Sequence, residues 1–403
     1  MRPCSASGAA DPRALIALLA VCGALGPVAT NLFLPALPLI REQFAVTVAA
    51  TQTTVSSFLV AYAFATLFTG PIAERFGRRP TILSGAAIFT MGSALCALAS
   101  SLPALIAGRV VQALGAAATL TGSRTVVADV FSDQMLPRMI ATLTMTMVIA
   151  TVLTPWAGGY IAAAFGWKAG FWMLLLAGTL LLVVALRRLP ETRPGAGAGH
   201  RIVAILLRSR RALAEREFVV TLCQASAIYA IFLVLIAYAP YLMRDVYGGA
   251  LADVGRYYIL MSLGYFVGNW LISRGRIKAD VRKVLRIALL IQLLGALASL
   301  AVALAPPGRP IWLFAPLLPM AFGQGLALPH LSARAVSPAP GFAGLASSLL
   351  GFAQQATAAA AVQGMGFART DTAVPVMLFC VAVSGLAMLA LLFTPRSRAA
   401  RLA

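Results

Sequence analysis

The chain has 403 residues, of which 60% are hydrophobic and 11% are charged, and its formal net charge is +20. Soluble domains carry about 45–50% apolar and about 25% charged residues, so this composition excludes an ordinary water-soluble protein. The positive charge does not indicate nucleic acid, because the basic residues lie between long apolar runs without interleaved aromatic residues. The five cysteines are scattered and form no disulfide or metal-ligand pattern.

Long apolar runs indicate membrane-spanning helices, since a helix needs about 20 apolar residues to cross a bilayer. The first run follows Arg2 and Arg13, but it is too long for the apolar core of a signal peptide and leads directly into further runs. The sequence therefore predicts an all-α integral membrane protein. Its twelve transmembrane helices are expected near residues 15–38, 51–72, 82–100, 104–127, 138–163, 168–186, 218–242, 252–273, 285–305, 311–333, 342–366 and 374–394.

Arginine and lysine are distributed unequally between the two sides of this predicted bundle. The side with both termini and the central loop holds 25 of them, including Arg124 and Arg138, whereas the other side holds six. In membrane proteins the cytoplasmic loops carry the excess of basic residues. We therefore predict a multi-pass protein of the cytoplasmic (inner) membrane with both termini in the cytoplasm.

The chain divides into two halves of six predicted spans, residues 1–186 and 218–403, joined by a cytoplasmic linker loop at 187–217. The loop at 70–80 recurs in degraded form at 268–276, at the corresponding place in the second half. Two pseudo-symmetric six-helix bundles with one topology are the plan of a secondary transporter, whose substrate site lies between them near the membrane centre. No loop has room for a catalytic domain, so the sequence argues against an enzyme.

Five short motifs occur in order along the predicted spans. They are Leu-Pro-Ala-Leu-Pro at 34–38, Gly-x-x-x-Glu-Arg-x-Gly-Arg-Arg at 70–79, Arg-x-x-Gln at 109–112, Thr-Pro-Trp-Ala-Gly-Gly at 154–159 and the Gln-containing segment at 343–355. Together they resemble the major facilitator superfamily, and within it the twelve-span Bcr/CflA-type drug-resistance exporters. The resemblance implies the major facilitator fold and a secondary active transporter that exports drug-like molecules by alternating access, as a proton antiporter.

The loop motif implies a conformational latch, in which Glu74 replaces the family's Asp. Gly70 is expected to let the second span approach a neighbouring helix, and Gly77 to allow the turn that follows. Glu74 would lie at the positive N-terminus of a helix from the other half, with Arg75 and Arg78 completing a charge network across the halves. The alternative is a loop whose arginines only orient the chain. The residues of the predicted latch are Gly70, Glu74, Arg75, Gly77, Arg78 and Arg79.

Pro155, Gly158 and Gly159 form the proline-glycine motif of the fifth span. The proline kinks the helix, and the glycines offer a smooth surface for close helix packing. The resemblance associates this motif with exporters. Ordinary small-residue packing and a specific role in antiport both fit the pattern.

Arg109 is the only basic residue placed deep inside a predicted span. A charge there costs about 2.5–3.5 kcal/mol on insertion scales, so it is expected to face the interior of the bundle and to have a partner. At 1.5 Å per residue it lies roughly 9 Å deep, level with Asn31 of the first span. We predict that Arg109 bonds Asn31 or the backbone carbonyls freed by Pro35. A purely structural brace between the two spans is the alternative.

Asn31 departs from the family pattern, because the exporters usually carry there an acidic residue that helps to move protons. Asparagine does not titrate, and all twelve acids of the chain map to loops, termini or helix ends. Asp129 and His330, near cytoplasmic helix ends, are the remaining candidates for titrating groups, and a structural role also fits each. Proton coupling is thus implied by the resemblance, and an uncoupled facilitator or metabolite exporter is the alternative.

Polar and aromatic side chains inside the spans indicate the substrate cavity. Such a cavity is uncharged apart from one arginine, so it favours neutral, zwitterionic or weakly anionic small molecules over lipophilic cations. We expect a monomer whose partners are this substrate and the lipid bilayer, with no nucleic acid and no cofactor other than a coupling proton. The candidate residues are Asn31, Tyr62, Arg109, Gln112, Tyr229, Tyr265, Asn269, Gln324, Gln354 and Gln355.

Overall fold

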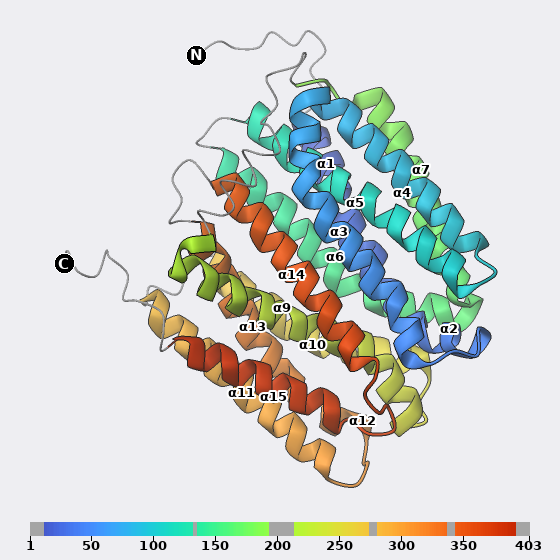
Figure 1. The fold of residues 1–403 in the computed structure, drawn as a ribbon, viewed down its shortest axis with the longest axis vertical. Helices are drawn as coiled ribbons and strands as arrows, with labels where there is room; N and C mark the ends of the chain where they lie inside the picture. Colours follow the sequence, from blue (N-terminus) through green and yellow to red (C-terminus); the bar gives the residue numbers. More distant parts are fainter. Residues whose placement is uncertain (1–11, 132–134, 193–212, 274–279, 337–342, 392–403) are drawn as a thin grey trace.

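The computed structural model describes residues 12–131, 135–192, 213–273, 280–336 and 343–391, and every regular element within these ranges is helical (Figure 1). This confirms the all-α fold. The elements of the first half are α1 (Pro12–Asn31), the 3-10 turn η1 (Leu34–Ala36), α2 (Leu37–Gln43), α3 (Val48–Phe76), α4 (Arg78–Leu98), α5 (Leu102–Val130), α6 (Leu136–Phe165) and α7 (Trp167–Arg188).

The second half repeats this plan, and a helix or two consecutive helices lies at each predicted span. Within the described ranges, nine helices are long and apolar enough to cross a membrane. Residues 193–212 of the predicted linker and residues 274–276 of the predicted loop repeat at 268–276 lie outside the described residues. The elements are α9 (Arg216–Tyr241), the π-helical turn η2 (Leu242–Val246), α10 (Leu251–Ser273), α11 (Val281–Leu304), α12 (Pro310–Phe314), α13 (Leu317–Val336), α14 (Ala343–Met365) and α15 (Val374–Ala390).

Local sequence signals set several helix ends. The side chains of Thr47 and Ser101 accept hydrogen bonds from backbone N–H groups at the starts of α3 and α5. Gly77 alone joins α3 to α4 with a φ of 100°, and Gly166 alone joins α6 to α7 with a φ of 79°. Residues with side chains rarely adopt such angles, so glycine allows two long helices to be joined by one residue.

The first predicted span is broken rather than continuous. α1 ends at Asn31, and the short elements η1 and α2 follow. Pro35 and Pro38 have no N–H group, so they cannot make the hydrogen bonds that would continue α1 through this region. The last carbonyl groups of α1 are therefore left to other donors.

Glycines allow the helices within each half to pack closely. A Cβ atom at Gly92 would lie 2.3 Å from the backbone nitrogen of Gln112, and one at Gly264 would lie 2.2 Å from the carbonyl oxygen of Leu318. These contacts join α4 to α5 and α10 to α13. The halves meet where α6 packs on α10 and where α3 packs on α14. Helices α3 and α14 lie side by side in Figure 1.

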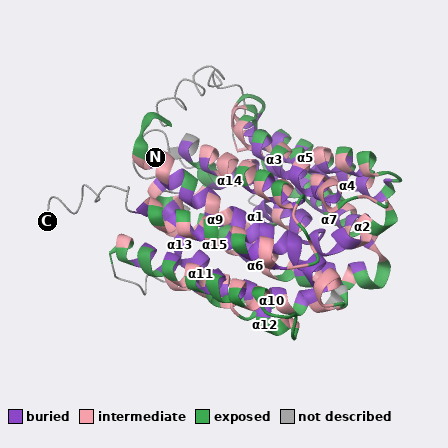
Figure 2. Cartoon of the chain, turned by 60° about the horizontal axis from the view of Figure 1, so that its bottom comes forward, coloured by how far each residue is buried: buried purple, intermediate pink, exposed green. Residues whose placement is uncertain are grey.

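The outward surface of the bundle is apolar. Leu176, Leu294 and Leu386 are more than half exposed on α7, α11 and α15. Figure 2 shows exposed positions along outer helices such as α11, whereas buried positions gather towards the centre. Exposed apolar surface of this extent marks a membrane-facing protein.

We call the end of the bundle where α1 begins and α3 ends the α1-start face. The end with α2 and the beginning of α3 is the opposite face.

Candidate functional site: a central cavity

A cavity of about 940 Å³ lies between the two halves. Helices α1, α3, α5 and α6 line one side of it, and α9, α10, α13 and α14 line the other. Along α3 the lining residues run from Phe58 to Glu74, and along α5 from Leu120 to Ala128, which is from mid-helix to the α1-start face. On α13 and α14 the lining residues also lie between mid-helix and this face. The cavity therefore extends from the centre of the protein towards the α1-start face.

Seven of the ten predicted cavity residues line this cavity in the structure. The other three predictions are wrong, because Arg109, Gln112 and Gln324 are fully buried and do not line the cavity. A polar residue inside a span can face the centre or a neighbouring helix of its own half, and sequence position does not distinguish the two. The seven lining residues are Asn31, Tyr62, Tyr229, Tyr265, Asn269, Gln354 and Gln355.

Aromatic rings from both halves meet at the central end of the cavity. The rings of Phe58 and Tyr62 stack with centroids 5.9 Å apart, and those of Phe232 and Tyr265 lie 5.7 Å apart. The Tyr229 hydroxyl donates to a neighbouring amide oxygen on α14 at 3.4 Å. The wall thus combines flat apolar surface with hydroxyl and amide groups, as small-molecule sites commonly do. Further hydroxyls on the wall come from Thr30, Thr66, Thr121, Thr125, Thr144, Thr151, Ser332 and Ser347.

Two charged side chains are among the lining residues, Glu74 near the mouth and Arg124 on α5. Arg124 was expected only to contribute to the cytoplasmic charge, and its place on the cavity wall was not predicted. The only sequence signal is its distance of six residues from the end of α5. The expected role of Gly70 in close helix packing is wrong, since a Cβ atom there would meet nothing within 4 Å and the residue lines the cavity.

Arg109 is completely buried inside the first half. Its Nη1 donates to Gln112 Oε1 at 2.6 Å and to the Ala29 carbonyl at 3.2 Å, and its Nε donates to the Thr54 carbonyl at 3.4 Å. The predicted bond to Asn31 is wrong, because Asn31 Oδ1 accepts no hydrogen bond among the described residues, while its amide nitrogen donates to a carbonyl of its own helix at 2.9 Å. Ala29 lies within the last turn of α1, where the carbonyls lack intrahelical donors, and this makes its carbonyl available to Arg109.

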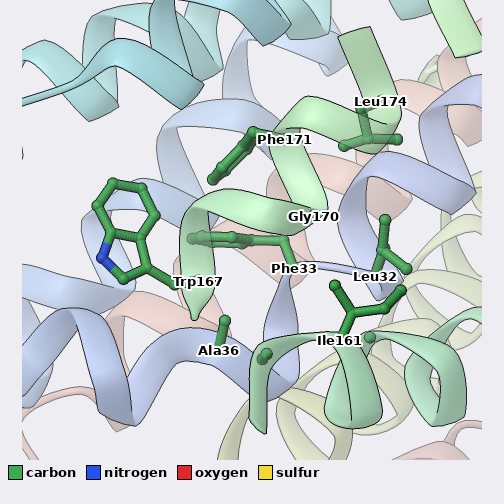
Figure 3. A pocket seen from close by; sticks show the side chains of 10 residues that line it. Leu32, Phe33, Ala36, Ile161, Trp167, Gly170, Phe171 and Leu174 are labelled. Carbon is green, nitrogen blue, oxygen red and sulfur yellow. The ribbon is translucent and has the colours of Figure 1, made fainter. Parts of the chain in front are cut away.

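Phenylalanine rings surround the guanidinium of Arg109. Its central carbon lies 4.1 Å from the centroid of Phe58, 4.7 Å from Phe33 and 5.9 Å from Phe171. Figure 3 shows Phe33 and Phe171 with Trp167 around a small apolar pocket beside the break in α1. Cation–π contacts stabilise a desolvated cation by about 2 kcal/mol. No ion pair of the described residues includes Arg109, so rings and carbonyls compensate its charge.

The proline-glycine motif of α6 packs against this break. A Cβ atom at Gly158 would lie 2.2 Å from the carbonyl oxygen of Leu32. Gly159 is also buried, and Pro155 removes a hydrogen bond from α6 one turn earlier. The motif therefore fits the irregular backbone that follows α1.

The halves are joined near the opposite face by close packing and hydrogen bonds. A Cβ atom at Gly255 on α10 would lie 2.9 Å from the indole of Trp156 on α6. The Ser56 hydroxyl on α3 donates to Gln363 Oε1 on α14 at 2.7 Å, and Gln363 Nε2 donates to the Ala49 carbonyl at 3.1 Å. These contacts close the space between the halves on this side.

Ion pairs between the halves also lie at the opposite face. Arg41 on α2 and Asp245 on η2 form two N–H···O contacts of 2.7 and 2.8 Å. Arg244 Nη2 lies 2.5 Å from Glu42 Oε1. The Thr370 hydroxyl donates to Asp245 at 2.9 Å.

The start of α4 is held by groups of its own half. Arg78 Nε donates to Asp129 Oδ2 at 2.9 Å, and Asp129 lies at the end of α5. Glu191, which follows α7, accepts the backbone N–H groups of Arg78 and Arg79 at 3.0 and 3.1 Å. Among the described residues Arg78 thus pairs within its own half, and a charge network across the halves stays a prediction. Sequence reasoning also missed Glu191, because no local pattern links residues 113 positions apart.

The remaining latch residues lie around the same loop. Glu74 lines the cavity and takes part in an interaction, and its expected place at the N-terminus of a helix from the other half stays a prediction. The guanidinium of Arg75 lies 5.2 Å from the ring of Phe76, and Arg79 donates to a backbone carbonyl of α7 at 2.8 Å.

The two candidates for titrating groups do not lie at the centre of the cavity. Asp129 pairs with Arg78 and accepts the Thr192 hydroxyl at 3.3 Å. His330 is half-buried on α13, next to a lining proline, and its Nε2 has no hydrogen-bond partner among the described residues. Proton transfer by either residue stays a prediction.

Two helical halves around a cavity that reaches one face define a membrane transporter. Residues 19–362 match the family described as Major Facilitator Superfamily, and the chain belongs to that family. It is a transporter and not an enzyme.

Curated relatives of this chain include drug-resistance proteins, which confirms the resemblance seen in the motifs. The chain is 28% identical to the bicyclomycin resistance protein homolog of Haemophilus influenzae, over 92% of this chain and 94% of that protein. It is also 28% identical to the multidrug resistance protein MdtL of Escherichia fergusonii, over 89% and 91% of the two chains.

Solved transporter structures share the fold. The D-xylose-proton symporter superposes with a TM-score of 0.76 at 15% identity, covering 95% of this chain and 97% of that one. The inward-open xylose transporter XylE from E. coli superposes with a TM-score of 0.75 at 14% identity, covering 96% and 97%.

Proposed function

We propose that the protein exports small drug-like molecules across the cytoplasmic membrane by alternating access, with the α1-start face in the cytoplasm. The excess of basic residues on that side supports this orientation. The observation that carries the proposal is the cavity, which is lined by both halves and runs to the α1-start face, while ion pairs join the halves at the opposite face. This arrangement corresponds to an inward-facing state that receives substrate from the cytoplasm.

The chemistry of the wall supports an uncharged or weakly anionic substrate. Rings of Phe58, Tyr62 and Tyr265 offer flat apolar surface, and Asn269 and Gln354 offer donors and acceptors. The names of the curated relatives support a drug as substrate. We propose that one chain in the bilayer, without nucleic acid, forms the complete transport unit.

Two modes of energy coupling fit this cavity. Resemblance to the exporters supports proton antiport, whereas the neutral Asn31 on the wall favours uncoupled facilitation or metabolite export. Glu74, near the mouth, is the only carboxylate among the described lining residues. The two modes differ in their response to the proton gradient.

The test is the accumulation of labelled chloramphenicol in efflux-deficient bacteria that express the full chain, with and without a protonophore. Lower accumulation that the protonophore abolishes would support proton-driven export. Lower accumulation that survives the protonophore would support the uncoupled mode. Unchanged accumulation, with the protein shown to be in the membrane, would contradict export of this drug.

A further inference from the structure

Arg124 is a cation placed inside the cavity. It lies on α5, six residues before the end of that helix, which is roughly 9 Å inside the bundle at 1.5 Å per residue. Its side chain is exposed to the cavity that it lines. Within the described part of the chain it forms no ion pair and no hydrogen bond, unlike Arg78 and Arg109.

Of the two charged residues that line the described cavity, Arg124 lies deeper than Glu74. Glu74 is the single acid among the described lining residues, and it lies nearer the mouth, at the last turn of α3, where it takes part in an interaction of its own. Arg109 lies directly behind the wall, 4.1 Å from the ring of Phe58, and has no acidic partner among the described ion pairs. A cavity with low-dielectric walls and one sign of charge concentrates ligands of the opposite sign.

The surroundings of Arg124 suit a ligand that combines an anion with a ring. Tyr62 lines the same cavity as Arg124, and its ring stacks with Phe58. Thr121, one turn earlier on α5, also lines the cavity. Its hydroxyl accepts a hydrogen bond from the Thr69 hydroxyl at 2.9 Å, so the hydroxyl proton of Thr121 can be donated to a ligand. A guanidinium and a hydroxyl donor beside a flat aromatic surface match a carboxylate, sulfonate or phosphate attached to a planar group.

We propose that Arg124 forms an anion-binding subsite, so that the preferred substrates are aromatic molecules with a negatively charged group. This inference rests on the proposed function, because it names the substrate class of the same cavity. The anion pairs with Arg124 and Thr121, while the ring of the substrate lies against Phe58 and Tyr62. The bound anion then supplies a negative partner for Arg124.

The first test measures the charge preference of the cavity without a known substrate. A single cysteine is placed at Gly351, which lines the cavity and where a Cβ atom would meet nothing within 4 Å. The background carries Cys4→Ser and C223S, because Cys223 is exposed whereas Cys22, Cys96 and Cys380 are buried.

Detergent-solubilised G351C protein is treated with methanethiosulfonates that differ only in bearing an ethylsulfonate or an ethyltrimethylammonium group. We expect the ratio of anionic to cationic reaction rates to fall about tenfold in Arg124→Gln. Gly308→Cys, in an exposed loop at the opposite face, is the control and should show no such change. Equal ratios at position 351 with and without Arg124 would overturn the proposal.

The second test uses chloramphenicol succinate and its uncharged parent as a matched pair. The succinate ester should protect the cysteine of G351C from N-ethylmaleimide at lower concentration than chloramphenicol does. Arg124→Gln should weaken protection by the ester at least tenfold and protection by the parent less than twofold, whereas Arg124→Lys should keep most of the preference. Absence of protection by the ester, or an equal loss for both compounds, would overturn the subsite.

These outcomes separate the subsite from the proposed export function. Loss of charge preference in Arg124→Gln together with unchanged cellular accumulation of chloramphenicol would retain the subsite and reject export of this drug. Active export of chloramphenicol with equal charge preference in both proteins would retain the function and reject the subsite.

Discussion

Arg41 and Asp245 form a bidentate ion pair between the halves, with N–O distances of 2.7 and 2.8 Å. The two residues are 204 positions apart in the sequence. The residues that follow them complete a crossed pattern, since Glu42 pairs with Arg244. Arg41 follows the first span and Asp245 follows the seventh, which occupy the same place in the two repeats. The two adjacent charges after each of these spans therefore join the halves at the opposite face.

Loss of the Arg41–Asp245 pair is expected to favour opening at the opposite face. Both side chains are about four-fifths buried, so the pair should contribute about 1 kcal/mol, which is roughly fivefold in the equilibrium between the closed and open states. Asp245→Ala should therefore increase labelling of a cysteine at Ser56 by a membrane-impermeant thiol reagent applied from that face.

The charge-reversed double variant is the matched control for this experiment. Arg41→Asp and Asp245→Arg should each increase labelling, and their combination should reduce it towards the level of the native pair. Labelling that does not respond to either single variant would show that the pair does not hold this face closed.

Arg109→Ala is expected to destabilise the protein more than it affects substrate contact. The substitution removes the donors of three hydrogen bonds and leaves a space between the rings of Phe33 and Phe58, at a cost of about 3 kcal/mol or more. Thermal unfolding in detergent should show a lower melting temperature and a lower yield of folded protein.

Arg124→Ala, on the same helix, is the control for Arg109, because its side chain lies in the cavity rather than in the packed core. Its melting temperature should stay close to that of the native protein. A normal melting temperature for Arg109→Ala together with lost ligand binding would assign Arg109 to substrate recognition instead of bracing.

Gly158→Ala is expected to disrupt the contact between α6 and the break in α1. The added methyl group would lie 2.2 Å from a backbone oxygen of Leu32, and backbone atoms cannot move aside as a flexible side chain can. Overpacking of this kind costs about 1–3 kcal/mol. Size-exclusion profiles and melting temperatures should show the loss, whereas Gly351→Ala, with nothing within 4 Å, should behave like the native protein.

Glu191→Ala is expected to weaken the start of α4. The carboxylate accepts two backbone N–H groups at the positive end of that helix, and loss of such a cap costs about 1 kcal/mol. Glu215→Ala is the matched control, because Glu215 precedes α9 without a side-chain capping bond. If both variants melt at the same temperature, the contacts of Glu191 do not stabilise α4.

The helices and their order were predictable from the sequence because each span must be apolar over a length set by the bilayer. The motif at 154–159 and the prolines at 35 and 38 likewise indicated irregular backbone, although not that α1 ends at Asn31. Helix ends at Gly77 and Gly166 depend on one residue each and are therefore local properties.

The partners of the charged residues depended on tertiary structure. Arg109 and Arg124 lie on the same helix, yet one is enclosed by rings and the other lines the cavity, because the rotation and packing of α5 decide which side faces the centre. Arg41 meets Asp245 only when two distant repeats are placed against each other. Sequence alone thus determined that this chain spans a membrane as two similar halves, since apolar length and charge asymmetry act locally. The cavity, its charges and the closed face arise from contacts between helices that no local pattern specifies.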